Sequence, residues 1–82
     1  MPQVSIRDFA FHPGELTVNV GETVTWTNDD TETDHTVTAD DGSFGSAPFP
    51  PRGTFSHTFT TRGRVPYHCS LHSTMRGTVT VT

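Results

Sequence analysis

The sequence contains one cysteine, no lysine and only two leucines among its 82 residues. A single cysteine excludes an internal disulfide, a common support of domains this small. The arginines are scattered and the net charge is −4, so a nucleic-acid-binding surface is not expected. No apolar run approaches the roughly 20 residues that span a membrane. Because a chain this short buries only about 60% of its unfolded surface, a bound metal is a candidate source of additional stability.

Acidic residues are concentrated in one region of the chain. Six of the nine acids lie between Asp29 and Asp41, which makes this stretch locally negative. A solvated loop and a docking surface for a partner both explain such a stretch, and the sequence leaves the two open.

What the sequence has in abundance is threonine, with sixteen residues, and short runs in which apolar and polar residues alternate. Such alternation is typical of half-buried antiparallel strands, and β-branched threonine suits their solvated face. The runs cover residues 15–20, 23–28, 35–39, 54–61, 64–69 and 77–82, with glycine- or aspartate-rich turns between them. We predict an all-β fold, a two-sheet antiparallel sandwich of about seven to eight short strands, in a single domain over residues 1–82.

The aromatic residues predict where the core lies. Trp26 occupies an inward position of its run, where one large ring fills the centre of a small sandwich. Phe9 and Phe11 are expected to cap one end of that core. Residues 43–53 are rich in proline and glycine, and they are interpreted as an ordered surface loop bearing Phe44 and Phe49.

The stretch "YHCSLHSTM" places Cys69, His72 and Met75 at even three-residue steps. A thiol nucleophile paired with the histidine would leave Met75 without a role. A structural zinc site would use cysteine and histidine, but methionine is a poor zinc ligand. A buried cysteine with incidental neighbours is a further alternative. Copper accounts for all three residues, because thiolate, thioether and imidazole are its usual ligands in electron-transfer sites.

A copper site of this type needs a second histidine. His35 is the best candidate, because it follows an acidic turn and begins the alternating run 35–39, which places it at a strand end. His57 shares its parity with two inward phenylalanines and is the only rival. His12 lies in a predicted turn and His68 points opposite Cys69, so both are expected to be solvated.

With these residues in place, the chain resembles a small cupredoxin, a type 1 blue copper protein of the plastocyanin and amicyanin kind. The similarity extends from about Val4 to Val81 and is carried by "FAFHPGELTVNVGETVTWTN", "DHTVTADDGSF" and "YHCSLHSTM" followed by "GTVTV". The Cys-x-x-His-x-x-Met spacing matches the short ligand loop of amicyanins. The resemblance implies a Greek-key sandwich holding one mononuclear copper ion. Its implied ligands are His35, Cys69, His72 and Met75.

Two positions depart from the family pattern. Ser73 stands where many short-loop relatives have proline, which implies a looser loop around His72. Thr36 stands where plastocyanins have an asparagine that ties the two ligand segments together, and we expect Thr36 to reach Ser70 instead. By resemblance, the imidazole edge of His72 reaches the surface. Nearby apolar residues would either pack within the loop or form a docking patch; these are Leu71, Pro48, Phe49 and Phe44.

The function expected from this resemblance is that of a soluble one-electron carrier that alternates between Cu(II) and Cu(I). It is not expected to be an enzyme, because no His-x-His pair supplies a second copper site. Transient redox partners would dock near His72, and we expect a monomer. The family implies a periplasmic or extracellular location. A copper-binding module for storage, delivery or sensing is the alternative function, since it would use the same ligands.

Overall fold

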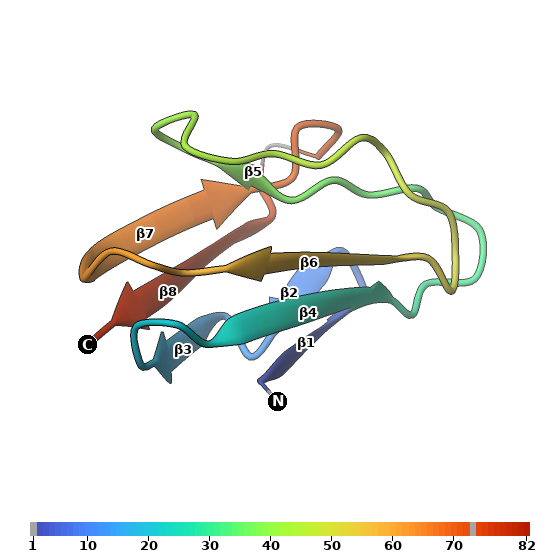
Figure 1. Cartoon of the computed structure of the whole chain (residues 1–82). Coiled ribbons are helices and arrows are strands. Elements are labelled where there is room, and N and C mark those ends of the chain that lie inside the picture. Colours follow the sequence, from blue (N-terminus) through green and yellow to red (C-terminus); the bar gives the residue numbers. More distant parts are fainter. Residues whose placement is uncertain (1, 73) are drawn as a thin grey trace.

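The computed structural model describes residues 2–72 and 74–82, and these residues form strands and loops without a helix. Figure 1 shows two sheets stacked as layers. The strands are β1 (Gln3–Arg7), β2 (Ala10–His12), β3 (Glu15–Val18), β4 (Thr23–Asn28), β5 (Thr38–Ala39), β6 (Thr54–Thr58), β7 (Gly63–His68) and β8 (Arg76–Val81). The predicted all-β sandwich is confirmed. Within the described ranges, no helix has the length and apolar character required to cross a bilayer.

Strand pairing is mixed, whereas the alternating pattern predicted antiparallel sheets. One sheet has the order β2-β1-β4-β6 and the other β3-β8-β7-β5. The β1–β4 and β3–β8 pairs are parallel. Parallel neighbours require a crossover connection. Here the chain leaves the first sheet after β2, forms β3 in the second sheet and returns to the first sheet with β4. The parallel pairs follow from this crossing of the chain between the two sheets.

The core lies between the two sheets, as the alternating pattern predicts. Along β4, Val24 and Trp26 are fully buried and alternate with partly exposed threonines. The Trp26 ring meets the edge of Tyr67 from β7, with ring centroids 5.4 Å apart. Burial raises the pKa of the Tyr67 hydroxyl to about 12. Trp26 is therefore a core residue, as predicted.

The N-terminal hairpin of β1 and β2 corrects one part of the sequence analysis. Phe11 is 4% exposed and packs against Tyr67, so it caps the core as expected. Phe9 is 53% exposed and does not. The turn of the hairpin consists of Asp8 and Phe9, with φ of 53° and 55°. A two-residue turn with both φ values positive suits the twist of the strands it joins, and here it removes Phe9 from the inward face of the sheet.

The predicted strand 35–39 is shorter than expected, because only Thr38 and Ala39 form β5. Two isolated bridges pair this part of the chain with the loop 43–53: His35 with Phe49 before β5, and Thr38 of β5 with Gly45. The proline-rich loop is thus ordered by backbone pairing.

The ring of Phe44 extends from this loop toward β6, where it stacks on His57 with centroids 4.4 Å apart. The ring of Phe59 meets the same imidazole edge to face, with centroids 4.8 Å apart. Burial lowers the pKa of His57. His57 therefore belongs to an aromatic cluster of Phe44, His57 and Phe59.

Gly77 provides a test of the packing around Tyr67. A Cβ atom at Gly77 would lie 2.5 Å from both Cζ and the hydroxyl oxygen of Tyr67, whereas a Cβ at Gly45 would meet nothing within 4 Å. We expect Gly77→Ala to lower the free energy of unfolding by about 1–3 kcal/mol, the usual cost of overpacking. Gly45→Ala is the control and should change it little. Chemical denaturation of both variants measures the difference, and equal stabilities would show that Tyr67 moves aside freely.

Candidate metal centre

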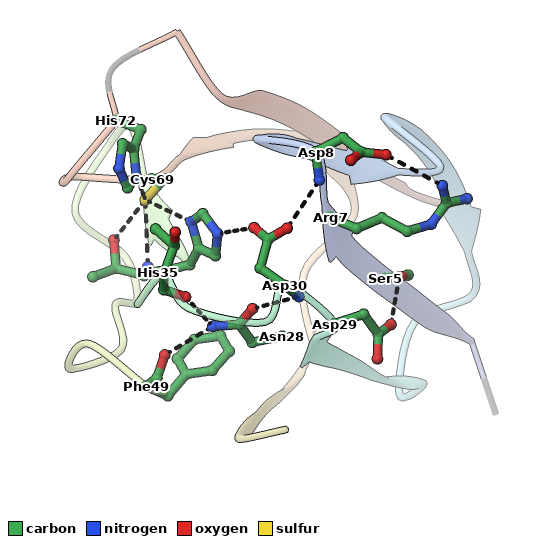
Figure 2. Close-up of polar contacts among 12 residues, drawn as sticks. Ser5, Arg7, Asp8, Asn28, Asp29, Asp30, His35, Phe49, Cys69 and His72 are labelled. Carbon is green, nitrogen blue, oxygen red and sulfur yellow. Dashed lines mark hydrogen bonds and ion pairs between the residues drawn. The ribbon is translucent and has the colours of Figure 1, made fainter. Parts of the chain in front are cut away.

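Three predicted site residues meet at one end of the sandwich. The Nδ1 atoms of His35 and His72 lie 3.8 and 3.7 Å from the Sγ atom of Cys69. The potential ligand atoms of the three residues all lie within 4.8 Å of one another. Figure 2 shows both imidazoles directed at the sulfur. Cys69 and His35 are fully buried and His72 is partly exposed, so one edge of the group is open to solvent.

The two buried side chains are held by strand structure. Cys69 directly follows β7 and continues the inward register of Tyr67. His35 exchanges two backbone hydrogen bonds with Phe49, in which each N–H donates to the other residue's carbonyl, at 3.2 and 2.9 Å. Both positions are therefore fixed by the backbone and not only by side-chain packing.

The loop between β7 and β8 closes on itself. The Cys69 N–H donates to the carbonyl of Met75 at 3.1 Å, and the Met75 N–H donates to the carbonyl of His72 at 2.9 Å. Met75 is 1% exposed. These bonds bring both ends of the Cys-x-x-His-x-x-Met motif together and place Met75 in the core beside Cys69.

The electrostatics of Cys69 favour its thiolate. Burial alone would raise the pKa of this thiol, but hydrogen bonds from the Thr36 backbone, the His35 and His72 imidazoles and the Leu71 backbone outweigh it and lower the pKa to about 6. Because the pKa is lower in the folded chain, the stabilisation by the thiolate is present above the ordinary pKa of 9.0 and is lost as the pH falls through about 6. At neutral pH the sulfur is ready to bind a metal.

The spacing of the donor atoms fits a metal ion. Bonds of about 2.3 Å to sulfur and about 2.0–2.1 Å to nitrogen are usual in such sites. With about 120° between the bonds, they separate sulfur and nitrogen by about 3.8 Å. The observed separations of 3.8 and 3.7 Å agree with this value. One thiolate and two imidazoles facing a common point therefore suit a mononuclear site for a thiophilic ion.

Thr36 joins the two ligand-bearing segments, as the sequence analysis expected. Its Oγ1 accepts a hydrogen bond from the Ser70 N–H at 2.8 Å and lies 3.0 Å from the Ser70 hydroxyl. The Thr36 N–H donates to Cys69 Sγ at 3.4 Å. One threonine thus contacts both the cysteine sulfur and the residue after it.

The remaining predicted residues occupy different environments. Leu71 is 50% exposed and Pro48 is exposed, whereas Phe49 is 8% exposed and packs in the core. Phe49 therefore holds His35 through their backbone pairing, and its buried ring offers no free docking surface. Phe44 lies in the aromatic cluster. Ser73 lies outside the described residues.

The other histidines are engaged elsewhere. His12 Nε2 lies 3.2 Å from the Arg7 carbonyl oxygen, and His68 Nδ1 lies 2.5 Å from a carboxylate oxygen of Asp40. Both are partly buried, not simply solvated as predicted. The rival ligand His57 belongs to the aromatic cluster, and the ligand group found among residues 2–72 and 74–82 does not include it.

The acidic stretch is largely structural. Asp29 contacts the Ser5 hydroxyl, and Asp30 lies beside His35. Asp40 binds His68. Hydrogen bonds from the Ser43 hydroxyl and from the Ser43 N–H lower the pKa of Asp41. The solvated-loop interpretation therefore misses a structural role for most of these acids.

Two residues near the centre were not predicted. The Phe9 ring meets the edges of His72 and His35, with centroids 5.1 and 6.0 Å apart. Asp30 Oδ2 lies 2.5 Å from Nε2 of His35. In the sequence, Asp30 is one acid among several and Phe9 is one aromatic among several. The predicted alternating runs begin at residue 15, so they carried no signal of a turn at residues 8–9.

Two imidazoles and a low-pKa thiolate at the end of a small β-sandwich define a protein built around a mononuclear metal site. The sequence matches the family of copper binding proteins described as the plastocyanin/azurin family over residues 2–82. The chain belongs to this family.

Similar proteins agree with this assignment. Amicyanin of Paracoccus denitrificans is 37% identical over 83 residues, which is 95% of this chain, and the chain spans 63% of that relative's length. The structure of a purple cupredoxin from Nitrosopumilus maritimus superimposes with a TM-score of 0.91 and 32% identity, covering all of both chains. A copper-containing nitrite reductase from Thermus scotoductus matches all of this chain, at a TM-score of 0.92 and 26% identity, but only 22% of its own chain.

The Thr36 contacts lead to a prediction of stability. Thr36→Val keeps the shape of the side chain but leaves the Ser70 N–H without its acceptor, which typically costs about 1–3 kcal/mol. Ser70→Ala removes one hydroxyl and leaves that N–H bonded to Thr36, so a smaller loss is expected. Thermal unfolding of the metal-free variants measures both. If Ser70→Ala proved as destabilising as Thr36→Val, the backbone contact would not be the important one.

Proposed function

We propose that this protein is a one-electron carrier with a single type 1 copper ion held by His35, Cys69, His72 and Met75. The observation that carries the proposal is the convergence of two imidazole nitrogens on a thiolate, at 3.8 and 3.7 Å. Burial of Met75 beside Cys69 supports its thioether as the fourth group that would hold the ion, as a weak sulfur donor. Family membership supports copper as the metal.

Copper bound by such ligands alternates between Cu(II) and Cu(I) and so supplies the one-electron chemistry. The contribution of the chain is rigidity. His35 is fixed by its backbone pair with Phe49, and Cys69 by its contacts with Thr36 and Met75. Ligands held in this way move little when the charge changes, which keeps the barrier to electron transfer small.

Electrons would enter and leave at His72, the partly exposed member of the group. Phe9 is 53% exposed, and its ring contacts that of His72. Leu71 is 50% exposed and directly precedes His72 in the chain. We propose these two residues as the docking patch for a transient redox protein, in place of the predicted Phe49 and Phe44. A small apolar patch suits short-lived encounters, which bury little area.

The proposal extends to the role of the chain as a carrier without substrate turnover. Among the described residues a single group of three candidate ligands is found. The nitrite reductase is a much longer chain, of which the present one matches 22%. We further propose a monomer in the periplasm or outside the cell, as the family resemblance implies.

The colour of the oxidised protein tests the ligand set. Addition of Cu(II) should produce an intense visible band from thiolate-to-copper charge transfer, with an EPR signal of a single copper site. Cys69→Ser should abolish the band, while His57→Gln should keep it, because His57 lies in the aromatic cluster. A blue Cys69→Ser protein would exclude Cys69 as a ligand.

Voltammetry distinguishes the carrier from a storage, delivery or sensing module. Fast and reversible electron transfer is expected of a carrier, and slow or irreversible transfer would favour the alternative function. The same measurement tests Met75. Met75→Gln should keep copper but lower the reduction potential, since a harder oxygen donor stabilises Cu(II). An unchanged potential would count against an axial Met75.

A further inference from the structure

Asp30 occupies a position between the metal centre and the N-terminal hairpin (Figure 2). Its Oδ2 atom lies 2.5 Å from Nε2 of His35, and its Oδ1 accepts a hydrogen bond from the Asp8 N–H at 3.0 Å. The His35 side chain is fully buried and that of Asp30 is 16% exposed. Each carboxylate oxygen therefore has a partner of its own, and the two partners belong to different parts of the fold.

The backbone of Asp30 is fixed independently. Its N–H donates to Oδ1 of Asn28 at 3.0 Å. Asn28 is buried, and its Nδ2 donates to the carbonyls of Thr33 and Phe49. Asn28 thus holds both the start of the acidic stretch and the strand partner of His35, so the carboxylate of Asp30 is aimed by a rigid frame.

The contact between Asp30 Oδ2 and His35 Nε2 determines which ring nitrogen of His35 carries the proton. A neutral imidazole that binds a metal through Nδ1 carries its proton on Nε2, and inside a protein that N–H requires an acceptor. Water cannot serve, because the side chain is fully buried. The Oδ2 atom of Asp30 accepts a hydrogen bond from this N–H, which leaves Nδ1 available to a metal bound at Cys69.

The second contact determines where Phe9 lies. The Asp8 N–H belongs to the hairpin turn in which both residues have positive φ, a conformation that non-glycine residues adopt at a cost. The hydrogen bond to Oδ1 holds this turn against the site. The same turn places the Phe9 ring on His72 and His35.

We propose that Asp30 is a positioning residue of the metal centre, whose two carboxylate oxygens orient His35 and fix the turn that holds Phe9 against His72. The inference rests on the proposed copper function and deepens it. It assigns to one side chain both the orientation of a buried ligand and the shape of the surface above the exposed one. A carboxylate is needed, because the two N–H groups meet different oxygens, and an asparagine would turn an NH2 donor toward one of them.

Asp30→Asn and Asp29→Asn form a matched pair for the test. Each substitution removes one negative charge, and the two residues are neighbours in the chain. Asp29 contacts the Ser5 hydroxyl, whereas Asp30 contacts a ligand of the metal centre. In the Cu(I) protein, which is diamagnetic, we expect the His35 Nε2–H proton far downfield, since its acceptor is charged. Asp30→Asn should move that proton upfield and shift the Phe9 ring resonances, and Asp29→Asn should leave both in place.

The reduction potential provides a second readout. Loss of a nearby anion disfavours Cu(II) more than Cu(I), so Asp30→Asn should raise the potential. Asp29→Asn should raise it less, because its carboxylate is exposed and does not contact a ligand. Thermal unfolding of both variants shows whether stability alone accounts for the change. If Asp30→Asn does not fold, the Nε2–H resonance of His35 in the wild-type protein still tests the inference. Rapid exchange of this proton with water would overturn it.

The outcomes separate the two proposals. A wild-type protein that takes up no copper would defeat the proposed function. A normal blue copper protein in which Asp30→Asn and Asp29→Asn give the same potential and the same His35 and Phe9 resonances would overturn only the role of Asp30. Distinct effects confined to Asp30→Asn would support it.

Discussion

The metal centre depends on one junction, the contact between the segment at His35 and Thr36 and the end of β7 at Cys69. These segments are more than thirty residues apart in the chain, and the Thr36 N–H reaches the cysteine sulfur at 3.4 Å. The sandwich brings them together because β5, which follows His35, pairs with β7. Without that pairing, the buried imidazole and the thiolate would have no reason to meet. The site is therefore a product of sheet topology.

The donor atoms are held with unequal firmness. His35 and Cys69 are fully buried and bonded through their backbones, whereas His72 lies in a loop and is partly exposed. Such an asymmetry is expected of a site that must keep its geometry while it exchanges electrons with another molecule. The buried contacts keep the positions of the donor atoms fixed, and the accessible imidazole of His72 provides the route for electrons.

Much of the architecture could be predicted from residue patterns. The alternation in residues 23–28 predicted β4 with its full bounds, and the register of Tyr67 and Cys69 predicted the inward thiol. The Cys-x-x-His-x-x-Met spacing identified the loop, since ligands close in sequence are easily recognised. His35 could be selected only by its place at the start of a run, and the resemblance reinforced it.

What could not be predicted depended on geometry that periodicity does not encode. The exposed position of Phe9 results from two positive φ angles in a turn, and alternation carries no information about such angles. Parallel pairing of β1 with β4 depends on which layer each strand joins, which is a property of the whole chain. The role of Asp30 depends on a contact with the hairpin, more than twenty residues away in sequence. Long-range contacts between polar side chains leave no local pattern.

The two bridges that join the loop 43–53 to His35 and to Thr38 of β5 determine where this region can change in length. Pairing at Thr38 with Gly45 and at His35 with Phe49 fixes the span between the bridges to three residues on the loop side. Added or deleted residues there would shift Phe49 out of register with His35. The exposed tip at residues 41–43 lies beyond both bridges, so we expect residues added at that tip to leave the buried imidazole in place.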